Sequence, residues 1–278
     1  MSSSWMIRNF WPKLGRLRLL FADLVQLLNT LFSGKTTAIR RFHSLCNSVI
    51  VIDEVQTVPN KMLTLFSLAV NFLSEICGAT VVLCSATQPC TEEIGHPMHG
   101  PIPEIVPYDH ALWEVFRRTN IQNAGTMSLE QIADFALERL CYADSLLIVC
   151  HKKSQAECLY ARMKDRDIAL FSLSAAMCMA HRRDVIDKLR GALEQKTRKV
   201  VCISTQVIEA GVDISFACVI RLSAGMDSVI QAAGRCNRNG EAGPGVFAPV
   251  YLIMCQNESL SKLPDIEQGK AATLELLT

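Results

Sequence analysis

Short runs of apolar residues alternate along this chain with longer segments whose apolar residues recur every three or four positions. The run Val49–Ile52 holds four consecutive β-branched residues, which predicts a central strand that is buried on both faces. The longer segments have the spacing of amphipathic helices. Strands that alternate with helices predict an α/β fold built on parallel, doubly wound sheets.

The alternation predicts two α/β regions and a connection between them. In the first region, strands at 49–52 and 79–84 flank a helix over 60–76, and shorter helices are expected within 14–31 and 38–45. In the second region, strands are expected at 145–150, 169–173, 199–204, 217–222 and 246–254, and helices at 128–142, 154–164, 180–194 and 227–234. The predicted divisions are an unassigned segment 1–27, a first lobe 28–110, a linker 111–127, a second lobe 128–255 and a tail 256–278.

Composition narrows the class of protein. Half of the 278 residues are apolar and 20% are charged, which is ordinary for a globular protein with a sizeable core. The net charge of +1 excludes a generally basic nucleic-acid coat, so any such contact must be local. The twelve cysteines include no pair with zinc-knuckle spacing, and their apolar neighbours predict buried thiols in a reducing, cytoplasmic setting. No segment has the length and apolar character of a membrane-spanning helix.

Polar clusters follow three of the predicted strands at the points where each strand leaves its sheet, and a fourth polar cluster lies on the last predicted helix. Ligands of open α/β sheets bind at the carboxyl ends of the strands, so these clusters are the candidate site. The clusters are Asp53-Glu54-Val55-Gln56, Ser85-Ala86-Thr87, the segment from Ser204 to Asp213, and the segment from Gln231 to Arg238. One of two adjacent carboxylates can hold Mg²⁺ through water while its neighbour activates a water for attack on a phosphate.

A phosphate-binding loop is absent from the sequence. Ser33-Gly34-Lys35-Thr36-Thr37 resembles one, but Asn29 stands where that loop needs its first glycine, and the preceding residues predict a helix. A turn with a threonine cap on the following helix is the interpretation we prefer.

Together, the four clusters resemble the motifs of a superfamily 2 helicase. The segments from Asn47 to Pro59 and from Gln231 to Gly240 resemble more closely the helicase–nuclease of type I CRISPR systems, which a surveillance complex recruits to target DNA. The resemblance runs from about residue 28 to about residue 252. It implies two RecA-like lobes, the first incomplete, that use ATP and Mg²⁺ and move on single-stranded DNA.

The resemblance also implies a role for each position. Asp53 would position Mg²⁺, Glu54 would activate the attacking water, and Gln56 would sense the γ-phosphate. Ser85 and Thr87 would couple hydrolysis to lobe movement. Thr205 and Gln206 would contact the DNA strand, while Gly211, Asp213 and Gln231 would contact the nucleotide. Arg235 and Arg238 would lie on one helix face and act as arginine fingers, which are worth about 10³–10⁵ in rate.

The departures from the family pattern leave alternatives open. The phosphate-binding loop and the nuclease domain are missing, so we expect a truncated helicase that is inactive alone, or one completed by another polypeptide that supplies both parts. A second hypothesis is a non-catalytic remnant that binds nucleic acid or a partner. A third is a different superfamily 2 helicase, acting on RNA.

Overall fold

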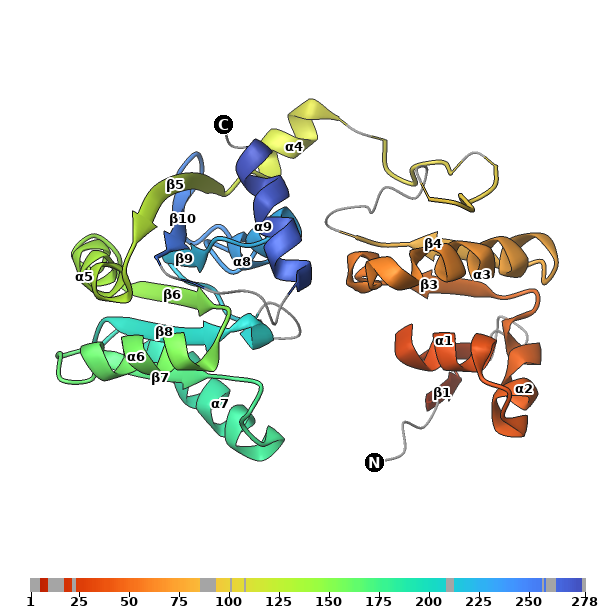
Figure 1. The fold of residues 1–278 in the computed structure, drawn as a ribbon, viewed down its shortest axis with the longest axis horizontal. Helices are drawn as coiled ribbons and strands as arrows, with labels where there is room; N and C mark the ends of the chain where they lie inside the picture. The colour runs from red at the N-terminus through yellow and green to blue at the C-terminus, as the bar shows by residue number, and fades with distance from the viewer. Residues whose placement is uncertain are drawn as a thin grey trace. The chain divides into compact units, whose positions relative to one another are not determined.

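The computed structural model describes residues 6–9, 18–21, 24–85, 94–100, 102–107, 109–208, 213–256, 258 and 264–276. The chain divides into two compact units, residues 1–105 and 106–278, which we call unit 1 and unit 2 (Figure 1). Each is described by itself.

Unit 1 contains a two-stranded parallel sheet, β3 (Val49–Ile52) and β4 (Thr80–Leu83). Helix α3 (Leu63–Glu75) connects the two strands, and Gly78 follows it with φ of +62°. The remaining elements are β1 (Met6–Asn9), β2 (Arg18–Phe21), α1 (Leu24–Phe32), α2 (Thr36–Phe42) and the 3₁₀ turns η1 (His43–Leu45), η2 (Val55–Thr57) and η3 (Asn60–Met62).

The core of unit 1 covers one side of β3 only. Ile52 packs with Val55, Phe66 and Leu73, whereas the side chains of Val49 and Val51 point to the other side. Val49 is 66% exposed and Val51 is 63% exposed, so the prediction of a strand buried on both faces is wrong. Within the described residues β4 is the single neighbour of β3, and no helix covers the second face.

The amino-terminal part of unit 1 departs from the predicted periodic helix. Residues Arg18–Phe21 form β2, which pairs antiparallel with β1, and α1 begins only at Leu24. Helix α2 begins at Thr36 with Lys35 at its N-cap and no side-chain cap, so the threonine cap predicted there is also wrong. Leucine spacing does not distinguish the strand from the helix because a four-residue strand has too few positions to show a period.

Unit 2 is a six-stranded, entirely parallel sheet with the strand order β5-β10-β9-β6-β8-β7 (Figure 1). Its strands are β5 (Thr119–Met127), β6 (Ser145–Cys150), β7 (Ala169–Leu173), β8 (Val200–Thr205), β9 (Cys218–Leu222) and β10 (Ala248–Cys255). Its helices are α4 (His110–Phe116), α5 (Leu129–Arg139), α6 (Lys153–Met163), α7 (Met179–Gln195), α8 (Met226–Ala233) and α9 (Pro264–Leu276), with the 3₁₀ turn η4 (Gln206–Ile208).

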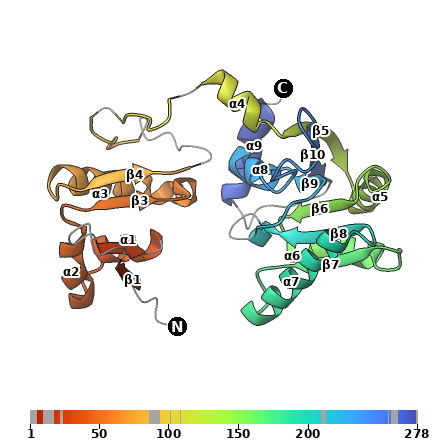
Figure 2. The ribbon, with the colours of Figure 1, turned by 180° about the vertical axis from the view of Figure 1, so that it is seen from behind.

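Helices cover both faces of this sheet. Leu146 and Ile148 of β6 pack in a core with residues of α5 and α6, and Leu147 and Val149 pack in a second core with residues of α7 and α8. Figure 2 shows the same sheet from behind. The expectation of an α/β fold with doubly wound parallel strands is confirmed.

Three elements lie where other structure was predicted. The linker expected over 111–127 contains most of α4 and the whole of β5, and the tail expected over 256–278 contains α9. Strand β5 is largely polar because it is an edge strand whose residues are mostly exposed, so it lacks an apolar run.

The predicted burial of cysteine is confirmed for six of the described thiols: Cys77, Cys150, Cys202, Cys218, Cys236 and Cys255. Burial raises the pKa of Cys150 and that of Cys236 to about 12, so both thiols stay protonated and unreactive. Within the described ranges no helix is long and apolar enough to span a membrane.

Candidate functional site

The acidic cluster of unit 1 lies directly at the carboxyl end of β3. Asp53 and Glu54 are both exposed, and the Asp53 carboxylate accepts a 3.0 Å hydrogen bond from the Glu54 backbone N–H. The next turn, η2, is fastened to β4 because the Val55 N–H donates to the Cys84 carbonyl over 3.2 Å. The acidic pair is therefore held at the sheet edge by backbone bonds from both strands.

Glu54, Gln56 and Ser85 form a chain of side-chain hydrogen bonds across the ends of β3 and β4. The Gln56 amide donates to the Glu54 carboxylate, and the Ser85 hydroxyl donates to the Gln56 amide oxygen. The structure thus brings together three residues that the sequence places up to thirty-one positions apart. Thr87, predicted beside Ser85, lies outside the described residues.

The backbone at Glu54 has left-handed geometry, with φ 55° and ψ 46°. This conformation costs a non-glycine residue roughly 1–2 kcal/mol, and such strain gathers at functional sites. The Thr57 hydroxyl donates to the Glu54 carbonyl over 2.7 Å and the Thr57 N–H donates to it over 2.9 Å, so the turn supports the strained residue. The turn fixes the direction in which the Glu54 carboxylate leaves the sheet.

The acidic pair fits Mg²⁺ better than a metal held by protein alone. Across the described residues, no three His, Cys, Asp or Glu side chains are grouped as metal ligands. Mg²⁺ keeps several waters and commonly uses one or two carboxylates together with phosphate oxygens of the substrate. Asp53 and Glu54 match that donor set.

In unit 2, Thr205 and Gln206 lie at the carboxyl end of β8, which runs between β6 and the edge strand β7. Thr205 ends the strand in register with Cys150 of β6, and Gln206 opens η4. Gln206 is exposed and Thr205 is half-buried. Neither side chain is hydrogen-bonded to another described residue, so both polar groups are available to a ligand at this edge.

Arg235 and Arg238 do not share a helix face, which corrects the prediction. Helix α8 ends at Ala233, after which the chain forms a bridge in which the Phe216 N–H donates to the Arg235 carbonyl over 2.9 Å. This bridge turns the two side chains in different directions. Arg235 is only 8% exposed and its Nε donates to the carbonyl of the buried Ile208 over 3.0 Å.

Arg238 is the exposed member of the pair. Its Nε lies 2.8 Å from a carboxylate oxygen of Asp213, and one of its terminal nitrogens donates to the Gly234 carbonyl over 3.2 Å. The Arg238 N–H donates to the Ser215 hydroxyl over 2.9 Å, and that hydroxyl donates to Glu241 over 3.0 Å. The structure therefore joins Asp213, which was expected to contact the nucleotide, to Arg238, which was expected to act as an arginine finger.

Two other residues, Gln231 and Gly211, were predicted to contact the nucleotide, and the structure describes only the first. Gln231 is half-buried in the last turn of α8. Gly211 lies outside the described residues.

Sequence reasoning missed a buried polar cluster at the carboxyl ends of β6 and β9. His151 is 8% exposed, and its Nε2 lies 3.0 Å from the Ser223 carbonyl, whereas its Nδ1 is buried without a hydrogen-bond partner among the described residues. Burial, together with the charge of Arg221, lowers the pKa of His151 to about 4, so the ring is neutral at pH 7. The Gln155 amide joins the cluster to the buried Glu258 through a 2.7 Å hydrogen bond. The histidine directly after an apolar run was the available signal.

Comparisons with known proteins show which proteins this chain is similar to. Residues 142–241 match the family described as "CRISPR-associated nuclease/helicase Cas3, C-terminal". A CRISPR-associated nuclease/helicase Cas3 of Haloferax volcanii is 44% identical over 77 residues, which cover 28% of this chain and 8% of that protein. The Cas3 of Methanothermobacter thermautotrophicus is 24% identical over 253 residues, which cover 86% of this chain and 29% of that protein.

Solved structures share the fold. The crystal structure of T. fusca Cas3-AMPPNP has a TM-score of 0.68 at 18% identity, covering 91% of this chain and 35% of that one. A CRISPR RNA-guided surveillance complex, pre-nicking, contains a chain with a TM-score of 0.61 at 17% identity, covering 89% of this chain and 37% of that one. The chain spans less than a third of the length of both curated relatives.

Proposed function

From the match of residues 142–241 to the C-terminal part of the Cas3 nuclease/helicase family, we propose that this chain is the DNA-tracking part of an ATP-dependent helicase in CRISPR defence. Its direct substrates would be single-stranded DNA and Mg²⁺-bound ATP. The observation that carries the proposal is the hydrogen-bonded chain from Glu54 through Gln56 to Ser85 at the carboxyl ends of β3 and β4. It joins the acidic pair to the second strand end of unit 1.

In this mechanism Asp53 would hold Mg²⁺ through water, and Glu54 would accept a proton from the attacking water. Bound Mg²⁺ would supply charge neutralisation at the phosphates. Gln56 and Ser85 orient the Glu54 carboxylate, since Gln56 donates a hydrogen bond to it and Ser85 donates one to Gln56. Arg238 neutralises phosphate charge after it exchanges the Asp213 carboxylate for the phosphate, and Asp213 then faces the ribose. Thr205 and Gln206 contact the phosphates of the DNA strand, while Gly211 and Gln231 contact the nucleotide.

Arg235 has a different role in this proposal from the one its sequence position implies. Its side chain is buried and donates a hydrogen bond to the Ile208 carbonyl at the end of η4. It therefore holds the turn after α8 against η4 rather than reaching a phosphate. The arginine-finger role belongs to Arg238 alone.

The sequence contains no phosphate-binding loop, so we expect negligible ATP turnover by the chain alone. Turnover through Asp53 and Glu54 would need a phosphate-binding loop beside them. The solved surveillance complex with a similar chain supports an RNA-guided assembly as the wider context.

Two measurements test the function. Binding of fluorescein-labelled oligothymidine should weaken several-fold in Thr205→Ala/Gln206→Ala and remain unchanged in Glu157→Gln, an exposed substitution on α6. Failure of the chain to bind single-stranded DNA would overturn the proposal, and tighter binding to oligouridine would favour an RNA helicase. The expected inactivity would be overturned by ATP turnover above about one per second, a rate within the usual range of enzymes, if Glu54→Gln abolished it.

A further inference from the structure

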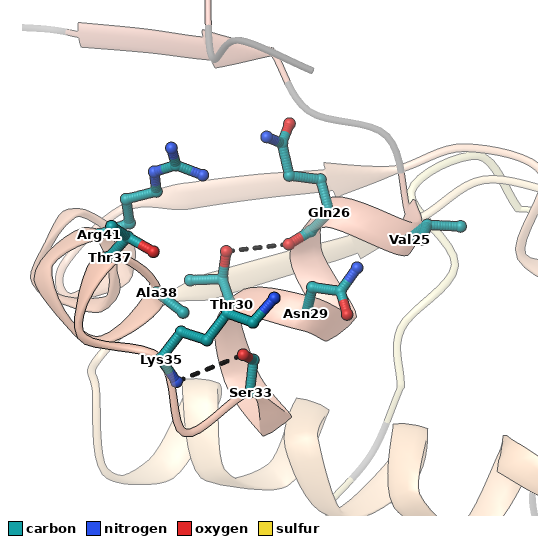
Figure 3. Close-up of a pocket in the computed structure, with 9 residues that line it drawn as sticks. All are labelled: Val25, Gln26, Asn29, Thr30, Ser33, Lys35, Thr37, Ala38 and Arg41. Carbon is teal, nitrogen blue, oxygen red and sulfur yellow. Dashed lines mark hydrogen bonds between the residues drawn. The ribbon is translucent and has the colours of Figure 1, made fainter. Parts of the chain in front are cut away.

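A polar cavity of about 270 Å³ lies between α1 and α2 of unit 1 (Figure 3). It shares no lining residue with the acidic cluster at the end of β3. Its volume is just below the range of about 300–1,000 Å³ that is typical of cavities for drug-sized ligands, so it fits one chemical group better than a whole nucleotide. Its polar lining comprises two amides, hydroxyl groups and two cations, among them Gln26, Asn29, Thr30, Lys35, Thr37 and Arg41.

The two charged residues that line the cavity, Lys35 and Arg41, are both cations. Lys35 and Arg41 are exposed, and neither makes an ion pair with any described residue. Two uncompensated cations beside one concave surface produce a positive potential that favours an anion.

The donors available to a ligand can be separated from those already in use. The Thr30 hydroxyl is buried and donates to the Gln26 carbonyl over 2.9 Å, so its proton is committed. The Thr37 hydroxyl is exposed and is not hydrogen-bonded to another described residue. Figure 3 shows the Lys35 side chain extending past Thr30 toward Asn29, with Arg41 on the opposite side of the cavity. The lining therefore offers a guanidinium, an ammonium, a hydroxyl and an amide as donors.

We infer that this cavity is a binding site for a phosphate group, separate from the nucleotide and DNA contacts assigned above. A guanidinium can bind phosphate oxygens through two parallel hydrogen bonds, and an ammonium adds a compact charge. Two sources carry this chemistry, the backbone of a single-stranded nucleic acid and free phosphate. The inference uses none of the residues assigned above to the nucleotide or the DNA. Binding of free phosphate here is independent of the proposed function, whereas binding of a nucleic-acid backbone rests on it.

The first experiment compares charge-matched variants of the full chain. Lys35→Gln/Arg41→Gln removes both cavity cations, and Arg40→Gln/Lys61→Gln removes two exposed cations of unit 1 that do not line the cavity. Binding of fluorescein-labelled oligothymidine is measured by anisotropy at several salt concentrations. If the cavity takes one backbone phosphate, the slope of log affinity against log salt should become shallower by about 0.7 in the cavity variant alone.

A neutral substitution separates recognition from general charge. Thr37→Val keeps the net charge and shape while it removes the hydroxyl, so affinity should fall by about two- to tenfold, as expected for one lost hydrogen bond. Polyglutamate serves as a competitor that offers carboxylates without phosphate. Equal effects of the two charge-matched variants, or displacement of oligothymidine by polyglutamate at equal charge concentration, would overturn the inference.

The second experiment identifies the source of the phosphate. Amide resonances of residues 29–38 are followed by NMR while inorganic phosphate, and separately oligothymidine, is added to the wild-type chain. Shifts with oligothymidine alone assign the site to a nucleic-acid backbone, and shifts with inorganic phosphate that Lys35→Gln/Arg41→Gln abolishes assign it to free phosphate. Circular dichroism confirms that each variant is folded, and the absence of shifts with both ligands overturns the inference.

Discussion

Replacing Arg235 by alanine should destabilise unit 2, whereas replacing Arg238 by alanine should barely affect its stability. Arg235 is 8% exposed and donates to the carbonyl of Ile208, which has no exposed surface. Losing this donor leaves a buried acceptor unsatisfied at about 1–3 kcal/mol, and two buried methylenes contribute about 0.8 kcal/mol each. We therefore expect the free energy of unfolding to fall by about 3–5 kcal/mol for Arg235→Ala.

Arg238 provides the matched comparison because it lies three positions further along the same turn. Its partner Asp213 has an 81% exposed side chain, and exposed pairs of this kind contribute about 0.2–1 kcal/mol. The assay is urea unfolding of the full chain, followed by far-UV circular dichroism and by hydrogen exchange of the peptide 200–208, which contains Ile208. Faster exchange in that peptide is expected for Arg235→Ala only.

Equal stability losses in the two variants would refute this assignment of roles, as would a loss below about 1 kcal/mol for Arg235→Ala, the value of an ordinary hydrogen bond. The distinction also affects functional assays. An Arg235 variant that lacks activity would report a displaced turn, so only an Arg238 variant tests the arginine finger.

Three further predictions concern stability. Burial and the charge of Arg221 lower the pKa of His151 from 6.5 to about 4, so the unfolded chain binds this proton more readily than the folded one. The free energy of unfolding should therefore decline by up to about 3 kcal/mol as pH falls from 6.5 to 4. Urea unfolding of His151→Gln should show a shallower decline. Gly78→Ala should lower the free energy of unfolding by about 1–2 kcal/mol, because φ is +62° and the new Cβ would lie 2.8 Å from Asn47 Oδ1. Thermal unfolding measures the loss, and Gly34→Ala is the control because nothing lies within 4 Å of its new Cβ. Gly269→Ala should speed hydrogen exchange in α9, since its Cβ would lie 2.9 Å from the Gly225 backbone. Gly191→Ala should not have this effect in α7, because nothing lies within 4 Å of the new Cβ.

The sequence predicted those elements whose apolar pattern is unambiguous. Strands β3, β6 and β7 begin and end at the predicted residues because each is a short apolar or alternating run bounded by polar residues. Strand β5 could not be predicted in this way, since a polar edge strand derives its structure from pairing with β10. The exposure of Val49 and Val51 was likewise unpredictable, because β-branched runs report strand preference and not the number of neighbouring strands.

The candidate site was predictable in composition but not in contacts. Adjacent carboxylates and an exposed arginine can be recognised from their positions after strands, whereas the hydrogen bond from Ser85 to Gln56 depends on the pairing of β3 and β4. Arg235 shows the limit of spacing arguments. Two residues three apart share a face only while the helix continues, and α8 ends at Ala233.

The pairing of β5 with β10 has a consequence for synthesis on the ribosome. Thr119 pairs with Ala248, so at about 5–20 residues per second the first described strand of unit 2 waits roughly 6–26 s for β10, its one neighbour among the described strands. A strand left unpaired for that time is exposed to other nascent chains, and low apolar content reduces its tendency to aggregate. The polar composition of β5, with Asn120, Gln122 and Asn123 exposed, is suited to that interval.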